Sequence, residues 1–299
     1  MKKQQTVNIF LKIFSYQQLM KTVMLLLLHL NLKLGENMKL KVRKFFRFIP
    51  LIHNILKLKS KARRNRNMPE YYKASEKHFF VQKFGSNILK HLNIKVEVEG
   101  FENIPSGPCF LTPNHSTYLD PLIIISALWN HGDGERRSRE ANFVAREEVK
   151  QKKTIYKISQ LIDTYYIDTK KPREALAILK DFGQHVKKNQ TCGVIFPEGT
   201  RTRDGKINNF NSGVFLTAQS TYIPLVPVTI NNAANALDGN RNGELIVKVK
   251  FHPTIKPQQF QTLDKKDFAN WVQQIVSKDY IEQVITSNET VKNEYTKRK

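Results

Sequence analysis

The feature that most constrains the fold of this chain is a series of short apolar runs that alternate with longer segments of helical periodicity. The runs expected to form strands are 94–99, 109–111, 142–145, 165–167, 193–196, 225–230 and 245–251. The segments expected to form helices are 39–60, 73–93, 121–129, 172–187 and 264–284. Strands that alternate with helices predict an α/β fold in which helices flank a mostly parallel central sheet. In such sheets, ligands bind beyond the carboxyl ends of the strands.

We divide the 299 residues into three regions. Residues 1–94 are expected to be a basic, amphipathic helical region that associates with a membrane, and residues 95–257 to be the α/β domain. Residues 258–299 are expected to be a C-terminal helical tail that becomes polar beyond Ser287. Within the first region, the basic and polar residues 61–66 predict a connector that follows a helix.

The charge of the chain favours an anionic partner. The formal net charge is +23, and residues 1–70 contain sixteen Lys or Arg against two acidic residues. Nucleic acid and an anionic membrane surface both fit this charge, and a solvated basic surface is the plain alternative. Basic and apolar residues are interleaved over 41–49, and residues 24–28 are all apolar. This mixture suits the boundary between lipid headgroups and acyl chains, so we expect a membrane partner and no nucleic acid.

The strongest apolar stretch, 23–34, is about a dozen residues long and is interrupted by His29, Asn31 and Lys33. Since a transmembrane helix needs roughly 20 apolar residues, the stretch predicts a helix or hairpin that lies at the interface. Translation from Met38 is an alternative, and it would remove the stretch from the protein.

The two cysteines, Cys109 and Cys192, lie in apolar, strand-like contexts and do not form a CxxC pair. We expect buried thiols, because free cysteine packs as a small apolar residue. Without a CxxC or HExxH pattern, the sequence predicts no metal site.

The first candidate for chemistry is the segment 114–120, with the sequence NHSTYLD. On a regular helix, His115 and Asp120 would lie about 140° apart and would not meet. Pro113 and Pro121 flank the segment and favour a turn in which His115 follows a strand and Asp120 begins the next helix. A carboxylate that holds one imidazole nitrogen leaves the other as a base for a hydroxyl group. A surface histidine beside a capping aspartate is the plain alternative.

The second candidate is the segment 196–201, with the sequence FPEGTR, at the end of an expected strand. Gly199 allows a ligand to approach the backbone, and the planar guanidinium of Arg201 suits phosphate. Glu198 could orient a basic group or bind a substrate hydroxyl. An ordinary strand exit with solvated charges is the plain alternative.

Together the two segments resemble the motifs of the glycerolipid acyltransferase family. Residues 114–120 resemble its NHxxxxD motif, residues 196–201 its FPEGTR motif, and residues 223–228 a later motif that contains proline. The segments follow each other in the family's order, and the similarity extends over about residues 95–255. Within the family, the chain resembles the 1-acyl-sn-glycerol-3-phosphate acyltransferases most.

The resemblance implies acyl transfer from acyl-CoA or acyl-carrier protein to the free hydroxyl of 1-acyl-sn-glycerol-3-phosphate, which gives phosphatidate for phospholipid synthesis. His115 would act as general base and Asp120 would orient it, without an acyl-enzyme, a metal or a cofactor. The residues implied to bind the substrate are Glu198, Gly199, Thr200 and Arg201. We also expect a membrane-associated protein on the cytoplasmic face of the cell membrane.

The chain departs from the family pattern at Thr169, where an arginine that helps to hold phosphate is expected, and at Asn211, where a lysine is common. Lys170, Lys171 and Arg173 are candidates to supply the missing charge. The departures leave open a second hypothesis, an acyltransferase that acts on a different lysolipid. A third hypothesis is a basic, non-enzymatic protein that binds membrane or nucleic acid.

Overall fold

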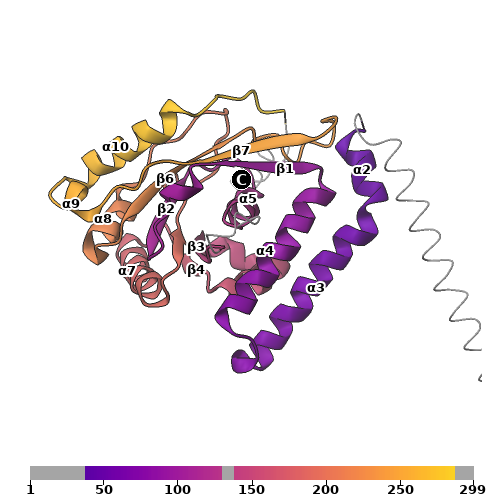
Figure 1. The fold of residues 1–299 in the computed structure, drawn as a ribbon, viewed down its shortest axis with the longest axis horizontal. Helices are drawn as coiled ribbons and strands as arrows, with labels where there is room; N and C mark the ends of the chain where they lie inside the picture. Colours follow the sequence, from indigo (N-terminus) through magenta and orange to yellow (C-terminus); the bar gives the residue numbers. More distant parts are fainter. Residues whose placement is uncertain (1–37, 130–137, 287–299) are drawn as a thin grey trace, which may run out of the picture.

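In the computed structural model, which describes residues 38–129 and 138–286, a seven-stranded sheet lies between two layers of helices (Figure 1). The strands are β1 (Ile94–Glu99), β2 (Cys109–Pro113), β3 (Ala141–Arg146), β4 (Tyr165–Ile167), β5 (Cys192–Val194), β6 (Leu225–Asn231) and β7 (Leu245–Phe251). Their order across the sheet is β1-β7-β6-β2-β5-β3-β4. The structure therefore has the α/β architecture that the alternation of strands and helices predicts.

The strands from β6 to β4 run parallel to one another, so their carboxyl ends share one edge of the sheet. Strand β7 runs antiparallel to β6, and β1 runs parallel to β7, so these two strands point the other way. Strands β2 and β5 are neighbours, with Cys109 opposite Cys192. The segments that follow β2 and β5 therefore leave the sheet side by side, and they are the two segments with candidate chemistry.

The helices form one layer on each face of the sheet. The α-helices are α2 (Leu40–Phe46), α3 (Phe48–Asn67), α4 (Ala74–His91), α5 (Asp120–Ala127), α6 (Lys153–Ser159), α7 (Pro172–Asn189), α8 (Ser212–Thr221), α9 (Pro257–Phe260) and α10 (Lys265–Lys278). Helices α4 and α5 pack on one face, with α3 outside them, while α7, α8 and α10 pack on the other (Figure 1). The core consists of the two apolar layers between helices and sheet.

Strand β2 lies in the middle of this core. Cys109, Phe110 and Leu111 are completely buried. Cys109 and Leu111 face the layer that contains α4 and α5, whereas Phe110 faces the layer that contains α7 and α8. A strand covered on both faces needs apolar side chains at every position, which explains the unbroken apolar run. The two thiols are buried as predicted, with their Sγ atoms 3.5 Å apart.

The predicted helix 39–60 is divided at Arg47 into α2 and α3, and two other predicted elements also differ from the structure. Residues 61–66 are not a connector, because α3 continues to Asn67 and buries Ala62. The stretch has no Gly or Pro that would end a helix, and Lys and Arg are good helix formers. The predicted helix 264–284 ends at Lys278, because backbone groups that follow form hydrogen bonds with a side chain of β6. The Asn231 amide donates to the Asp279 carbonyl at 2.7 Å and accepts from the Ile281 N–H at 2.8 Å.

The expected interfacial helix over 23–34 and the polar tail beyond Ser287 lie outside the described residues. Within residues 38–129 and 138–286, no helix is both long enough and apolar enough to cross a bilayer. Of the expected basic amphipathic region, the structure describes α2, α3 and α4, which pack along one flank of the α/β layers (Figure 1).

Candidate active site

The segment after β2 is fixed to the neighbouring strand by Asn114. Its side chain is buried, and its Nδ2 donates to the Ile230 carbonyl at 3.0 Å while its Oδ1 accepts from the Ile230 N–H at 2.7 Å. The side-chain amide of Asn114 therefore forms the hydrogen bonds to β6 that the backbone of a further strand residue would otherwise form. The chain can therefore turn after Pro113, and His115 comes to lie at the carboxyl edge of the sheet.

His115 and Asp120 meet as the sequence predicts, across a turn between a strand and a helix. Asp120 is the first residue of α5 and is completely buried. Its Oδ2 lies 2.7 Å from His115 Nδ1 and also accepts from the backbone N–H groups of Ser116 and Thr117, at 2.6 and 2.8 Å. These backbone bonds hold the carboxylate in place, so that His115 Nδ1 is the donor and Nε2 remains available to accept a proton.

Two further contacts hold His115 from the second segment. The imidazole stacks on the ring of Phe196, with centroids 4.2 Å apart and an interplanar angle of 28°. The His115 carbonyl accepts from the backbone N–H of Thr202 at 2.8 Å. Because these contacts come from the segment after β5, both the ring and the backbone of His115 depend on that segment.

Glu198 meets the first segment at the backbone of His115. Its carboxylate is buried, and Oε1 accepts from the His115 N–H at 2.6 Å. Its Oε2 accepts from the backbone N–H and from the side-chain amide of Asn208, both at 2.8 Å. Burial raises the pKa of Glu198 to about 7, although these hydrogen bonds act in the opposite direction. The contacts of Glu198 therefore connect the two segments.

Gly199 is required by its backbone conformation. Its φ is +66°, in the left-handed region that favours glycine, and an added Cβ would lie 3.0 Å from the Asn211 amide nitrogen. That amide donates to the Pro197 carbonyl at 2.9 Å, so Asn211, which replaces a lysine of the family pattern, closes the loop. Thr200 follows Gly199 and is half-buried.

Arg201 and Lys152 both lie over the ring of Tyr118. The guanidinium carbon of Arg201 is 3.6 Å from the ring centroid, and the ammonium nitrogen of Lys152 is 5.6 Å from it. Tyr118 belongs to the His115–Asp120 turn and is exposed. Arg201 therefore lies beside the His115–Asp120 turn. Lys152 is a second cation at this turn, and the sequence interpretation did not include it.

The structure does not bring Lys170, Lys171 and Arg173 next to His115. They follow β4, which is the edge strand and lies three places from β2, a distance of roughly 14 Å at normal strand spacing. All three are exposed, and Lys171 pairs with Glu174 at 3.2 Å. Arg146, the last residue of β3, lies at the same edge but closer to β5, and it pairs with Glu148 at 3.1 Å.

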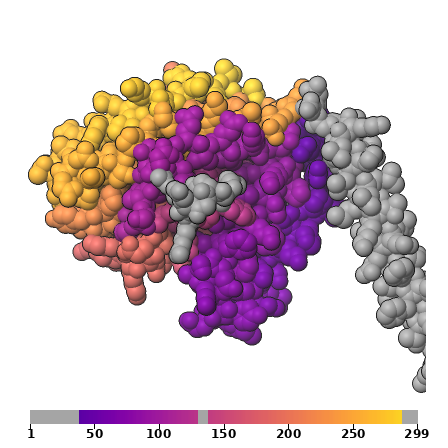
Figure 2. Space-filling model, viewed as in Figure 1, coloured from indigo at the N-terminus to yellow at the C-terminus, as the bar shows by residue number. Residues whose placement is uncertain are grey.

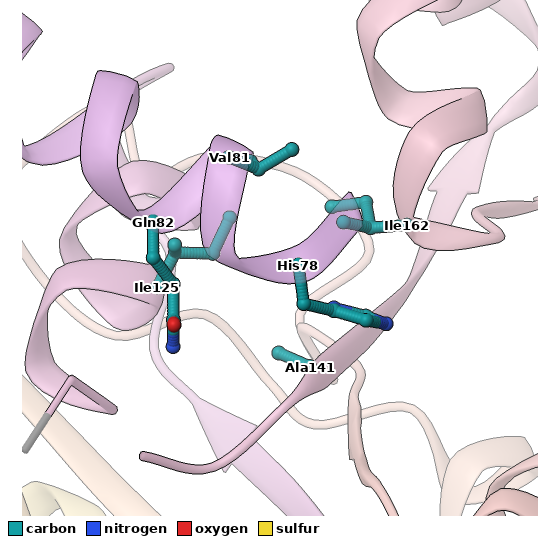
Figure 3. A pocket seen from close by; sticks show the side chains of 6 residues that line it. All are labelled: His78, Val81, Gln82, Ile125, Ala141 and Ile162. Atoms are coloured by element: carbon teal, nitrogen blue, oxygen red, sulfur yellow. The ribbon is translucent and has the colours of Figure 1, made fainter. Parts of the chain in front are cut away.

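A small internal cavity shares no residue with this site (Figure 3). The space is too narrow for a water molecule and is lined by His78, Val81, Gln82, Ile125, Ala141 and Ile162. Although the Glu140 carboxylate lies 3.7 Å from His78, burial lowers the pKa of His78 to about 4. We therefore describe His78 as a neutral histidine of the core.

Comparison with known proteins agrees with this geometry. Residues 95–231 match the family model named Acyltransferase. A probable 1-acyl-sn-glycerol-3-phosphate acyltransferase from Mycoplasma pneumoniae is 30% identical over 228 residues, which cover 73% of this chain and 84% of the relative. A 1-acyl-sn-glycerol-3-phosphate acyltransferase from Saccharomyces cerevisiae is 26% identical over 190 residues, 62% of this chain and 58% of the relative.

A solved structure has the same fold. The crystal structure of the 1-acyl-sn-glycerophosphate acyltransferase PlsC from Thermotoga maritima superposes with a TM-score of 0.56 at 21% sequence identity. The match covers 78% of this chain and 95% of that chain. With the family match, the relatives and the paired His115 and Asp120, the chain belongs to the 1-acyl-sn-glycerol-3-phosphate acyltransferase family of O-acyltransferases.

Proposed function

We propose that the protein transfers an acyl group from an acyl thioester to the free hydroxyl of 1-acyl-sn-glycerol-3-phosphate, giving phosphatidate. The observation that carries this proposal is the 2.7 Å contact between Asp120 Oδ2 and His115 Nδ1. It defines a base that is oriented through one nitrogen and open at the other. The names of the relatives support the acceptor, since they are 1-acyl-sn-glycerol-3-phosphate acyltransferases.

In the proposed reaction, His115 Nε2 takes the proton of the acceptor hydroxyl as its oxygen attacks the thioester carbonyl. The new C–O bond forms and the C–S bond breaks, and the departing thiolate takes the proton back from the imidazolium. Asp120 stabilises the transient positive charge on His115 and keeps Nδ1 as the donor. The base ends each cycle in its starting state, so this sequence needs no covalent acyl-enzyme.

Arg201 supports an acceptor that carries phosphate, because it lies beside the His115–Asp120 turn without an ion-pair partner among the described residues. The second candidate function is acyl transfer to a different lysolipid, and Thr169 favours it, because it stands at the position where the family pattern has an arginine. For the donor, acyl-CoA and acyl-carrier protein both present the thioester that the reaction requires.

We also propose that α2 and α3 bind the membrane surface. Phe45, Phe48 and Ile49 have exposed fractions of 78%, 59% and 68%, and they share the segment 41–49 with four basic residues. The helices form one flank of the molecule (Figure 2). Large exposed apolar side chains beside cations suit the interface of an anionic bilayer. The expected location is therefore the cytoplasmic face of the cell membrane.

The activity is tested with the purified full chain, lysophosphatidate, other lysolipids and a panel of acyl-CoA and acyl-carrier-protein donors. We expect product with lysophosphatidate, and a His115→Ala variant that loses it. Transfer to another lysolipid but not to lysophosphatidate would select the second candidate. No transfer with any pair would overturn both.

Membrane binding is tested by flotation with vesicles that contain phosphatidylglycerol. The double variant Phe45→Glu/Ile49→Glu is expected to float less than wild type, because it replaces two apolar side chains of this surface with charged ones. Leu176→Glu, which changes a 38% exposed residue of α7 in the other helix layer, is the matched control. Equal flotation of both variants would contradict the proposal.

A further inference from the structure

Three separate parts of the chain bring their side chains together at Tyr118. The ring comes from the turn between β2 and α5 and is 42% exposed. Arg201 comes from the segment after β5 and lies 3.6 Å from the ring centroid. Lys152 precedes α6 and lies 5.6 Å from the same centroid. An aromatic ring attracts cations through its quadrupole, so one exposed tyrosine gathers two positive charges.

Neither cation is neutralised by a carboxylate within residues 38–129 and 138–286. Other cations near this edge are paired, since Arg146 contacts Glu148 at 3.1 Å and Lys150 contacts Glu147 at 2.8 Å. The charged ends of Arg201 and Lys152 each contact the Tyr118 ring. Two unneutralised cations on one surface favour an anion, and stacking leaves the N–H groups at the edge of a guanidinium open to it.

The position of Tyr118 ties this pair of cations to the reaction. Tyr118 lies three residues after His115 and two before Asp120. The backbone N–H of Thr202, the neighbour of Arg201, donates to the His115 carbonyl at 2.8 Å. An anion held at Tyr118 would therefore be held close to the proposed base.

We propose that Tyr118 is a platform that presents Arg201 and Lys152 together to the phosphate monoester of the acceptor. The proposal rests on the proposed function and names two residues that determine its specificity. Lys152 supplies the second positive charge that Thr169 does not. Two cations suit a phosphate monoester, which carries up to two negative charges, better than a phosphodiester, which carries one.

The first test compares Lys152→Gln with Lys153→Gln, which removes the adjacent exposed charge at the first residue of α6. We expect Lys152→Gln to raise the KM for lysophosphatidate about tenfold, as the loss of one charge-assisted hydrogen bond does, with kcat within about twofold. The inhibition constant of inorganic phosphate should rise by about the same factor. Lys153→Gln should change neither constant. Equal effects of the two variants would overturn the proposal.

The second test uses Tyr118 itself. Tyr118→Leu should raise the KM for lysophosphatidate, and Tyr118→Phe, which keeps a ring, should raise it less. With lysophosphatidylglycerol, a phosphodiester acceptor, Lys152→Gln should have a smaller effect. If Lys152→Gln raises the KM of acyl-CoA instead, the cations serve the phosphates of the donor and the proposal is wrong. A wild-type protein without transfer activity would instead refute the proposed function, so the two failures can be told apart.

Discussion

The most informative single substitution is Glu198→Gln, because it separates the position of His115 from the stability of the fold. The carboxylate accepts three hydrogen bonds, one from the His115 N–H and two from Asn208. A glutamine has one oxygen and one NH₂ group in the same space. Whichever way the amide is turned, the NH₂ group faces an N–H group, and either His115 or Asn208 loses its acceptor.

Two effects on stability oppose each other. A lost hydrogen bond to a charged group costs about 1.5–3 kcal/mol. The wild-type carboxylate, however, has a pKa raised to about 7 from 4.5, which corresponds to a cost of about 3 kcal/mol for holding the charge inside the protein at pH 8. Glutamine carries no charge and removes that cost. At pH 8 we therefore expect the free energy of unfolding of Glu198→Gln to be within about 2 kcal/mol of wild type.

The activity should change much more than the stability. Displacement of a catalytic group by about 1 Å can cost about 10²-fold in rate, so we expect kcat to fall about 10²-fold. The KM for the lysolipid should stay within about threefold, because Glu198 does not contact the acceptor in this reasoning. Asn208→Ala is the matched control. It removes one donor to Oε2 and keeps the bond to His115, so its kcat should fall by less than about tenfold.

Steady-state kinetics and urea unfolding at several pH values test both parts. A raised pKa means that the wild-type carboxyl group contributes stability fully below about pH 4.5, and that this contribution is lost as the pH rises through about 7. The stability of Glu198→Gln relative to wild type should therefore increase between these values and level off above them. If Glu198→Gln instead raised the KM for the lysolipid strongly and kept kcat, the reasoning would be refuted, and Glu198 would be assigned to substrate binding.

Three further predictions follow from named contacts. His115→Ala should lower kcat by about 10²–10⁴-fold with little change in Tm, measured by release of the donor thiol and by thermal unfolding, since the side chain is partly exposed. Asn114→Ala leaves the buried Ile230 N–H and carbonyl without their partner, so urea unfolding should show a loss of about 2–4 kcal/mol. The pKa of His78 is lowered from 6.5 to about 4, so its stabilising effect is present above 6.5 and declines as the pH falls toward 4. Acid titration of unfolding should show that His78→Gln loses up to about 3 kcal/mol less over this range than wild type does.

The sequence was sufficient for the strands and for the edge of the sheet where the two candidate segments lie. Local patterns carry that information, because a buried strand must be apolar along its length and the chain must change direction where it ends. The direction of β7 was not predictable in this way, since alternation has the same period in parallel and antiparallel strands. Helix α8 also gave little signal. It packs between α7 and α10, so an apolar stripe on one side does not mark it.

Within the site, the sequence predicted contacts between near neighbours and missed contacts between distant ones. His115 and Asp120 are five residues apart, and the flanking prolines indicated the turn that joins them. Glu198 is 83 residues from His115, and nothing in its local sequence specifies an N–H group of another segment as its partner. Lys152 was missed for the same reason, because its relation to Tyr118 depends on where α6 begins relative to the sheet.

The pairing of β2 with β5 explains why both motifs are needed at one site. Asp120 controls His115 through the side chain, by fixing which ring nitrogen donates. Glu198 and Thr202 control it through the backbone, since one accepts from its N–H and the other donates to its carbonyl. These backbone hydrogen bonds are possible because β2 and β5 are adjacent and parallel, so the segments that follow them begin at the same edge of the sheet. The proposed base is thus oriented by its own segment and positioned by the segment after the neighbouring strand. That second segment also carries Arg201, so the proposed base and the proposed phosphate-binding group are held in a fixed relation.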